Sequence, residues 1–119
     1  MEPIAAISTP LAPSAIGVVR LTGDGAIAIA EKVFRPLRKK PLSQCPAREM
    51  IYGDMLAPDG ALLDRGLCVT FAADHSYTGE ESAEFYCHGS PVAMQEVLRA
   101  LFAAGARQAK GGEFTRRAF

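Results

Sequence analysis

The chain has 119 residues, of which 49% are apolar and 22% charged, as is typical of one globular domain. Thirteen Lys and Arg residues balance thirteen Asp and Glu residues, so any attraction to nucleic acid or to a membrane has to be local. Three widely spaced cysteines without a C-x-x-C pair, and only two histidines, predict reduced thiols and no zinc site. With no signal peptide and no apolar run of ~18 residues, the sequence predicts a cytoplasmic protein that does not bind membranes.

The chain begins with two predicted strands. Residues 4–9 (IAAIST) form a short apolar run, and the prolines within 9–14 predict a loop after it. Residues 15–23 (AIGVVRLTG) are rich in β-branched side chains and end in glycine, which is typical of a strand.

A helix and a basic segment come next. Residues 24–34 carry apolar side chains at helical spacing, with Asp24 as the expected N-cap. The G-x-G-x-x-A pattern at 23–28 is interpreted as a glycine turn and not a dinucleotide fingerprint, because Asp24 would meet the pyrophosphate. Residues 35–48 hold three prolines and five basic residues, which predicts a linker or arm that is either solvated or in contact with phosphate.

The second half predicts a β-hairpin, a further strand and the clearest helix. Two strands, within 49–57 and 62–73, flank the turn Pro-Asp-Gly, and a fifth strand is expected near 82–88. Residues 90–105 predict a helix with Ser90 as its cap. Its expected buried stripe is Met94, Val97, Leu98, Leu101 and Phe102.

The C-terminal end of the chain is expected to be extended and then helical, with Thr115 as an N-cap candidate. Because the chain stops on an apolar Phe119 soon afterwards, we expect that it was cut within a helix of a longer protein. The order of elements, β(2)-α-β(3)-α, predicts an α+β fold in which two helices pack on a small mixed sheet.

The strand at 82–88 raises the main functional question. Alternation puts Ala83, Phe85 and Cys87 on one face and Glu84, Tyr86 and His88 on the other. Cys87 is therefore expected to be a core residue, without a hydrogen bond to its neighbour His88. Glu84 either faces water or lines a pocket, where its carboxylate can accept two parallel hydrogen bonds from a planar N–H/NH₂ edge.

Arg20 closes the run IGVVR within the strand predicted at 15–23, and it shares a face with Ile16 and Val18. Two interpretations stay open. Its stem covers apolar surface at the solvent boundary, or its guanidinium is aimed at a carboxylate or carbonyl group.

Four stretches, IAAISTP, IGVVRLTG, SYTGEESAEFYCHGSP and GARQAKGGEFTRRAF, closely resemble the N-terminal domain of bacterial tRNA-modification GTPases of the MnmE (TrmE) family. The match runs in order over nearly the whole chain. The resemblance implies one N-terminal domain at 1–119, without catalytic residues of its own, followed in the parent by helical and GTPase domains. GTP, Mg and K would bind only in that GTPase domain.

The resemblance also implies half of the folate-binding fold of aminomethyltransferases, a homodimer, and 5-formyltetrahydrofolate near the dimer interface. The family's folate contacts fall on Arg20 and Glu84, with Tyr77, Tyr86 and His88 as further candidates. The parent would act with a flavin-dependent partner protein on the wobble uridine of tRNA.

The sequence departs from the family pattern at two places: LAPSA (11–15) replaces a glycine-rich segment, and Ser90 replaces the second glycine of the family's His-Gly-Gly. Two alternatives therefore remain. The chain is a dimerisation scaffold whose folate site has decayed, or it is a subdomain of a folate-dependent aminomethyltransferase.

Overall fold

The computed structural model describes residues 1–8 and 14–119. Its strands are β1 (Ile4–Ile7), β2 (Ser14–Thr22), β3 (Phe34–Pro36), β4 (Ile51–Leu56), β5 (Leu62–Phe71), β6 (Ser82–Gly89) and β7 (Arg107–Gln108). Its helices are α1 (Ala26–Val33), α2 (Pro91–Ala103) and α3 (Glu113–Ala118), with short 3₁₀ turns η1 (Leu42–Gln44) and η2 (Ala73–His75). Residues 9–13 of the loop predicted at 9–14, and with them the end of the first predicted strand, lie outside the described residues.

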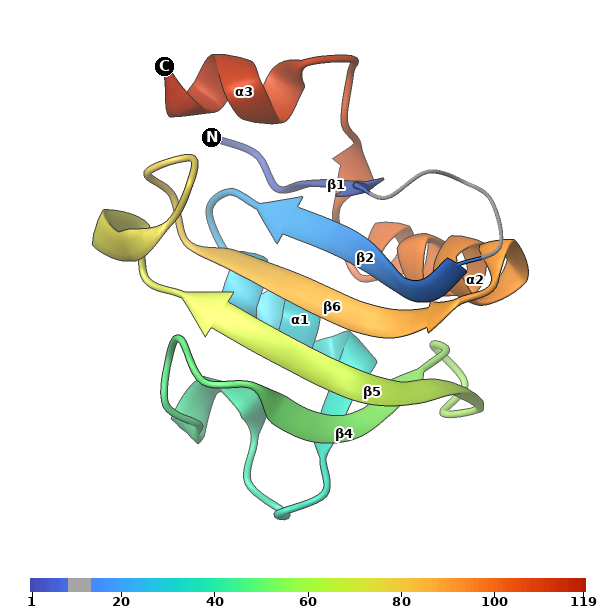
Figure 1. Cartoon of the computed structure of the whole chain (residues 1–119). Helices are drawn as coiled ribbons and strands as arrows, with labels where there is room; N and C mark the ends of the chain where they lie inside the picture. Colours follow the sequence, from blue (N-terminus) through green and yellow to red (C-terminus); the bar gives the residue numbers. More distant parts are fainter. Residues whose placement is uncertain (9–13) are drawn as a thin grey trace.

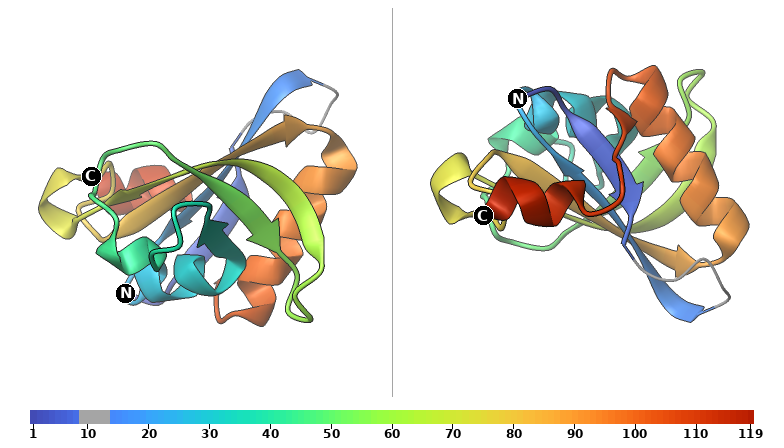
Figure 2. Two further views of the ribbon diagram at one scale, coloured as in Figure 1. Left: turned by 90° about the horizontal axis from the view of Figure 1, so that it is seen from below. Right: turned by 90° about the horizontal axis from the view of Figure 1, so that it is seen from above.

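Within the described residues, the seven strands form one sheet in the order β3-β4-β5-β6-β2-β1-β7 (Figure 1). Its strands are antiparallel except for β7, which lies parallel to β1, so the sheet is mixed. Helices α1 and α2 cover one face, and α3 lies near the N-terminus, beyond β1 (Figures 1 and 2). This arrangement confirms the predicted α+β class.

The core lies between the sheet and the two long helices. Side chains on the inner faces of β2 and β6, such as Val19 and Phe85, are fully buried together with Ala30, Val97 and Leu101 from the helices. The opposite face of the sheet is not covered by α1 or α2 (Figure 1). The core side of β6 is as predicted, because Ala83, Phe85 and Cys87 are all buried.

Helix α2 forms where its sequence signals place it. The Ser90 hydroxyl accepts a hydrogen bond from the Ala93 amide, and Pro91 occupies the first turn. Met94, Val97 and Leu101 are fully buried, whereas Leu98 and Phe102 pack partly buried against the core. Gly105 follows the helix with φ +126°, a backbone conformation that favours glycine.

Two predicted helix caps are wrong. Gly25, with φ +79°, precedes α1, and the Asp24 carboxylate instead accepts a hydrogen bond from the Met1 amine at 2.8 Å. Helix α3 begins at Glu113 after Gly112, so Thr115 lies inside the helix. Both helices start from a left-handed glycine, which turns the chain without a side-chain cap.

The prediction of a linker at 35–48 is wrong for part of that segment. Strand β3 follows α1 directly and pairs with β4, so this edge strand was missed. Leu42 and Cys45 are also buried and tie the segment to the core. Since β3 lies antiparallel to β4 at the far edge from β1, the unit after β2 is not a dinucleotide-binding βαβ motif.

Two further predictions can be compared with the fold. The hairpin of β4 and β5 is confirmed, with the Ala57 amide donating to the Ala61 carbonyl across the turn. Cys45, Cys68 and Cys87 are free and buried, as expected. In the part of the chain that the structure describes, no helix is long and apolar enough to cross a membrane.

Candidate functional site

The sheet register places Arg20 of β2 directly opposite Glu84 of β6. The Arg20 Nε donates a hydrogen bond to the Glu84 Oε2 at 2.9 Å. The Glu84 side chain is 18% exposed and that of Arg20 is 38% exposed, so the pair stands at the edge of solvent. The two residues singled out from the sequence thus meet on the open face of the sheet, at a distance in sequence that no local pattern could reveal.

Tyr86 supports the carboxylate from the same strand. Its hydroxyl donates to the Glu84 Oε1 at 2.5 Å. Partial burial, and then this hydrogen bond, raise the pKa of Tyr86 to about 12, so the phenol remains a donor at neutral pH. Each of the two Glu84 carboxylate oxygens thus accepts one hydrogen bond. Because each oxygen has two lone pairs, it can accept a further one.

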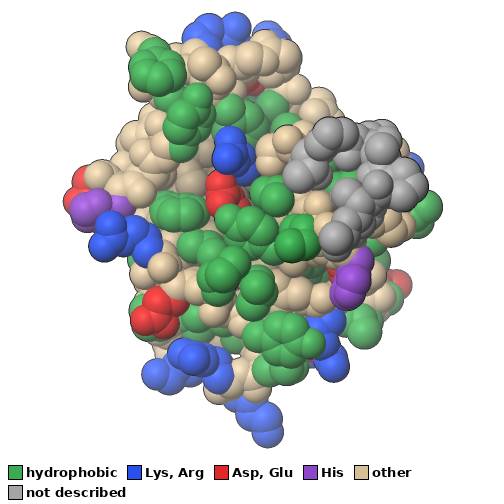
Figure 3. All heavy atoms as spheres, viewed as in Figure 1, with side chains coloured by type: hydrophobic (Ala, Val, Ile, Leu, Met, Phe, Trp, Pro, Cys, Tyr) green, Lys and Arg blue, Asp and Glu red, His purple; other side chains and the backbone are tan. Residues whose placement is uncertain are grey.

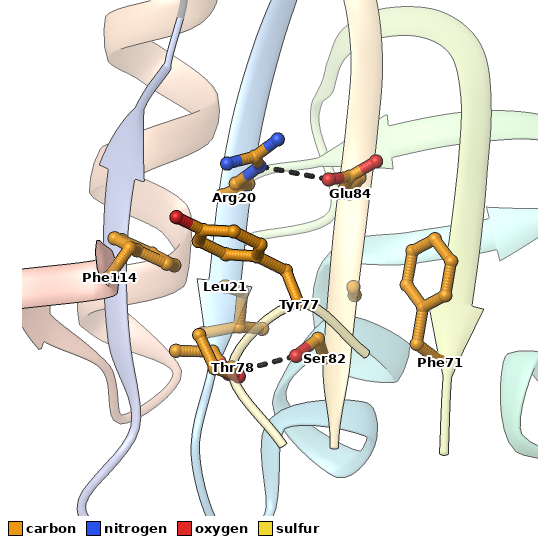
Figure 4. A pocket seen from close by; sticks show the side chains of 10 residues that line it. Arg20, Leu21, Phe71, Tyr77, Thr78, Ser82, Glu84 and Phe114 are labelled. Atoms are coloured by element: carbon orange, nitrogen blue, oxygen red, sulfur yellow. Dashed lines mark hydrogen bonds and ion pairs between the residues drawn. The ribbon is translucent and has the colours of Figure 1, made fainter. Parts of the chain in front are cut away.

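A pocket of about 140 Å³ opens beside the Arg20–Glu84 pair. It is lined by Arg20, Leu21, Thr22, Phe71, Tyr77, Thr78, Ser82, Ala83, Glu84 and Phe114. Phe114 of α3 and Phe71 of β5 lie on opposite sides of the pocket, and Tyr77 lies between them (Figure 4). The Arg20 Cζ is 5.7 Å from the centre of the Tyr77 ring, within the range of a cation–π contact.

Hydroxyl groups fix the loop that carries Tyr77. The Thr22 hydroxyl lies 2.6 Å from that of Thr78 and 2.8 Å from that of Ser82. Thr22, Thr78 and Ser82 are buried, so these bonds join the loop at 76–81 firmly to β2 and β6. The aromatic wall of the pocket therefore rests on a satisfied polar network.

Ion pairs hold α3 against the same loop. The Arg117 side chain is only 5% exposed, and its terminal nitrogens lie 3.2 Å from Glu80 and 3.3 Å from Glu113. Arg107 pairs with Glu113 at 2.6 Å. The hydrogen bonds from Arg107 are the main reason that the pKa of Glu113 is lowered to about 2. Through these contacts α3 brings Phe114 to the pocket.

The remaining candidates divide between two places. Tyr77 lines the pocket, and Tyr86 adjoins it through its hydrogen bond to Glu84. His88 does not reach it, because its Nδ1 lies 2.7 Å from the Asp64 Oδ1 at the other end of β6. Burial raises the pKa of the Cys87 thiol to about 11, which fits a core residue and not a nucleophile.

Several lining residues escaped sequence reasoning. Phe71, Thr78, Ser82 and Phe114 come from β5, the loop at 76–81, β6 and α3, and no spacing pattern joins them. The family-like stretches were the available signal, since SYTGEESAEFYCHGSP contains Thr78 and Ser82 and GARQAKGGEFTRRAF contains Phe114. Among residues 1–8 and 14–119, no cluster of three or more His, Cys, Asp or Glu side chains could hold a metal ion.

The open face of the sheet is also apolar beyond the pocket. Ile16 is 60% exposed and Tyr52 is 52% exposed. With Leu67 and Tyr86 they border a second hollow of about 270 Å³. Figure 3 shows hydrophobic side chains spread across this face around the acidic and basic groups at its centre.

Comparison with known proteins identifies the family. Residues 3–119 match the model of the GTP-binding protein TrmE N-terminus. The chain belongs to the TrmE N-terminal domain family.

Its relatives include tRNA modification GTPases MnmE from Symbiobacterium thermophilum (44% identity), Carboxydothermus hydrogenoformans (45%) and Aquifex aeolicus (43%), each aligned with 99% of this chain. The chain spans about a quarter of the length of these relatives, at 26%, 26% and 25%. TrmE membership favours the GTPase family over the aminomethyltransferase alternative.

Proposed function

We propose that this TrmE-type domain binds a reduced folate, 5-formyltetrahydrofolate, in the pocket beside Arg20 and Glu84. The observation that carries the proposal is the Arg20–Glu84 pair itself, with Tyr77 against Arg20 and with Phe114 and Phe71 on opposite sides of the pocket (Figure 4). A carboxylate, a guanidinium and two aromatic rings suit a flat, polar heterocycle.

In this proposal, the Glu84 carboxylate binds the pterin ring. The free lone pairs of its carboxylate accept the ring N–H and NH₂ groups, while Tyr86 keeps the carboxylate oriented. The Arg20 Nε is occupied by Glu84, and within the described residues its two terminal nitrogens have no hydrogen-bond partner. They are therefore available to a carbonyl or carboxylate of the ligand.

The size of the pocket supports a site completed by a second copy of the chain. At about 140 Å³ it is well below the ~300–1,000 Å³ of pockets that enclose a drug-sized ligand. One ring system fits, and the rest of the folate would extend over the open sheet face. We propose that this apolar face, with Ile16 and Tyr52, forms the homodimer interface and encloses the rest of the ligand.

The wider role follows from the family. We infer that the domain serves a longer GTPase that modifies the wobble uridine of tRNA together with a flavin-dependent partner protein. The domain itself supplies the folate and the dimer, and GTP would bind elsewhere in the parent. The relatives, of which the chain covers about a quarter, are named as tRNA modification GTPases, and the wobble uridine and the partner protein are what the family resemblance implies.

Calorimetric titration of 5-formyltetrahydrofolate into the domain tests the proposal. We expect binding by the wild type and a dissociation constant at least ~30-fold higher for Glu84→Ala, because loss of a buried paired carboxylate costs about 2–5 kcal/mol. Glu96→Ala is the matched control, since it removes an exposed carboxylate from α2 and should bind as the wild type does. A dimer that gives no heat in any of the three proteins would instead favour the pure dimerisation scaffold.

A further inference from the structure

Basic side chains without acidic partners gather on the segment that links α1 to β4. From Lys32 to Arg48 the chain has no Asp or Glu, and its cations are Lys32, Arg35, Arg38, Lys39, Lys40 and Arg48. Among the described residues, Arg35 alone of these six forms an ion pair, with Asp54 at 3.5 Å. The chain as a whole is neutral, so this surplus is a local feature.

Three of these cations, Arg35, Lys39 and Lys40, line a groove of about 690 Å³, and Arg38 directly precedes Lys39 in the chain. The apolar residues of the groove are Phe34, Pro36, Leu37, Pro41 and Leu56, and its charged residues are Arg35, Lys39, Lys40, Glu31 and Asp54. Asp54 is already neutralised, because Arg65 also binds it at 2.6 Å. The groove therefore presents a net positive charge to solvent. Figure 3 shows Lys and Arg side chains at the lower end of the molecule, where Figure 1 places this loop.

The turn that carries the cations is well defined. Lys39 has φ +60°, which is uncommon for a residue with a side chain, and its amide donates to the Pro36 carbonyl. Pro41 follows, and the buried Leu42 fixes the chain after it. Because the backbone is held in place, a bound polyanion would lose less of its binding energy to ordering the loop.

We propose that this groove at the β3 edge binds the sugar-phosphate backbone of RNA. Unpaired lysine and arginine side chains match a row of phosphates, and the relatives are named as tRNA modification GTPases. Among the described residues that line the groove, the aromatic side chain is that of Phe34, which is buried, so the contact is with the RNA backbone and not with stacked bases. The proposal rests on the inferred role in a tRNA-modifying protein, but its site is separate from the folate pocket.

Fluorescence anisotropy with a labelled RNA hairpin, the anticodon arm of a tRNA, tests this site in the complete chain at several salt concentrations. Arg38 and Lys40 are exposed and have ordinary backbone angles, so Arg38→Glu combined with Lys40→Glu should leave the fold intact. We expect this double variant to bind at least tenfold more weakly. The slope of log K against log salt should become shallower by about 2, since each lost phosphate contact removes ~0.7–0.9.

The matched control changes two exposed cations elsewhere. Lys110→Glu combined with Arg116→Glu makes the same charge change beside α3. We expect it to retain most of the affinity. The proposal is overturned if the wild type fails to bind the hairpin, if both double variants weaken binding equally, or if the wild type prefers a polyglutamate peptide to RNA. Folate titrations on the same samples separate this result from the folate proposal, because we expect the groove variant to retain full folate binding.

Discussion

At the scale of single residues, the site depends on a pair of opposite charges that face each other across two strands. Arg20 and Glu84 are 64 positions apart in sequence, and the antiparallel register of β2 and β6 places them side by side. Glu84 is oriented twice, by Arg20 and by the Tyr86 phenol. An ion pair at the edge of solvent contributes little to stability, so the arrangement of two donors around the Glu84 carboxylate is better understood as a prepared binding group.

The shape of the guanidinium should matter as well as its charge. Arg20→Lys keeps the positive charge but removes the planar set of donors, and one charge-assisted hydrogen bond contributes about 1.5–3 kcal/mol. We expect a dissociation constant for 5-formyltetrahydrofolate roughly 10- to 100-fold higher than that of the wild type. Arg99→Lys on α2 is the matched control. Equal affinities for all three proteins in calorimetry would show that Arg20 does not touch the ligand.

At the scale of elements, the pocket depends on how α3 is held. Phe114 reaches the pocket only because Arg117 and Arg107 bind the acidic groups of Glu80 and Glu113. The Tyr77 ring also contacts Phe119, with ring centres 6.4 Å apart. Helix α3 has six residues and would be marginal in isolation, so these contacts account for its position.

This arrangement makes stability depend on acidity. The pKa of Glu113 falls from 4.5 to about 2 on folding, so its stabilising contribution is fully present above about pH 4.5 and is lost as the pH falls toward 2. We expect Glu113→Gln to be less stable at neutral pH and to lose less stability on acidification. Asp54, whose pKa is also lowered, should retain part of the acid dependence.

Urea unfolding measured across this pH range gives the comparison, with Glu96→Gln as an exposed control on α2. The same drop in unfolding free energy between pH 4.5 and pH 2 for Glu113→Gln and for the wild type would contradict the assigned role of Glu113.

At the scale of the whole molecule, one face of the sheet is covered by helices and the other is apolar but open. Such a face is a common feature of proteins that associate. The proposed folate pocket opens onto the same face, so ligand and partner copy would share one surface. The basic groove lies at the β3 edge, where it could meet RNA without competing with either.

Association should therefore respond to a charge on the open face. We expect Ile16→Glu to raise the dissociation constant of the homodimer at least tenfold, because a buried unpaired carboxylate is costly. Val92→Glu places the same charge at a residue that is 68% exposed on α2 and should leave the dimer intact. Sedimentation equilibrium distinguishes the two. A dimer of unchanged strength in Ile16→Glu would exclude this face as the interface.

The sequence predicted the fold well where local patterns are strong. Helix α2, the β4–β5 hairpin and the buried side of β6 were all predicted, since each has a capping, turn or alternation signal. Strand β3 was missed because three residues beside prolines carry no period. The starts of α1 and α3 were predicted wrongly because each helix follows a glycine with positive φ, a backbone conformation that the sequence alone does not indicate.

The candidate site was predictable only in part. Strand alternation placed Glu84 on the open face, and the family resemblance named it together with Arg20. Neither signal predicted the hydrogen bond between the two side chains. Phe71 and Phe114 join the pocket through tertiary packing of distant elements. His88 was grouped with Glu84 by alternation alone. It lies two residues beyond Tyr86 along β6 and pairs with Asp64 instead.

The most direct test of the central claim is a titration of the ¹⁵N-labelled domain with 5-formyltetrahydrofolate, followed in two-dimensional NMR spectra. We predict that the amide signals of Tyr77, Thr78, Glu84 and Phe114 shift together and saturate, while those of the β3 edge stay unchanged. Spectra in which these four signals do not move at excess ligand would contradict a folate site built around Arg20 and Glu84.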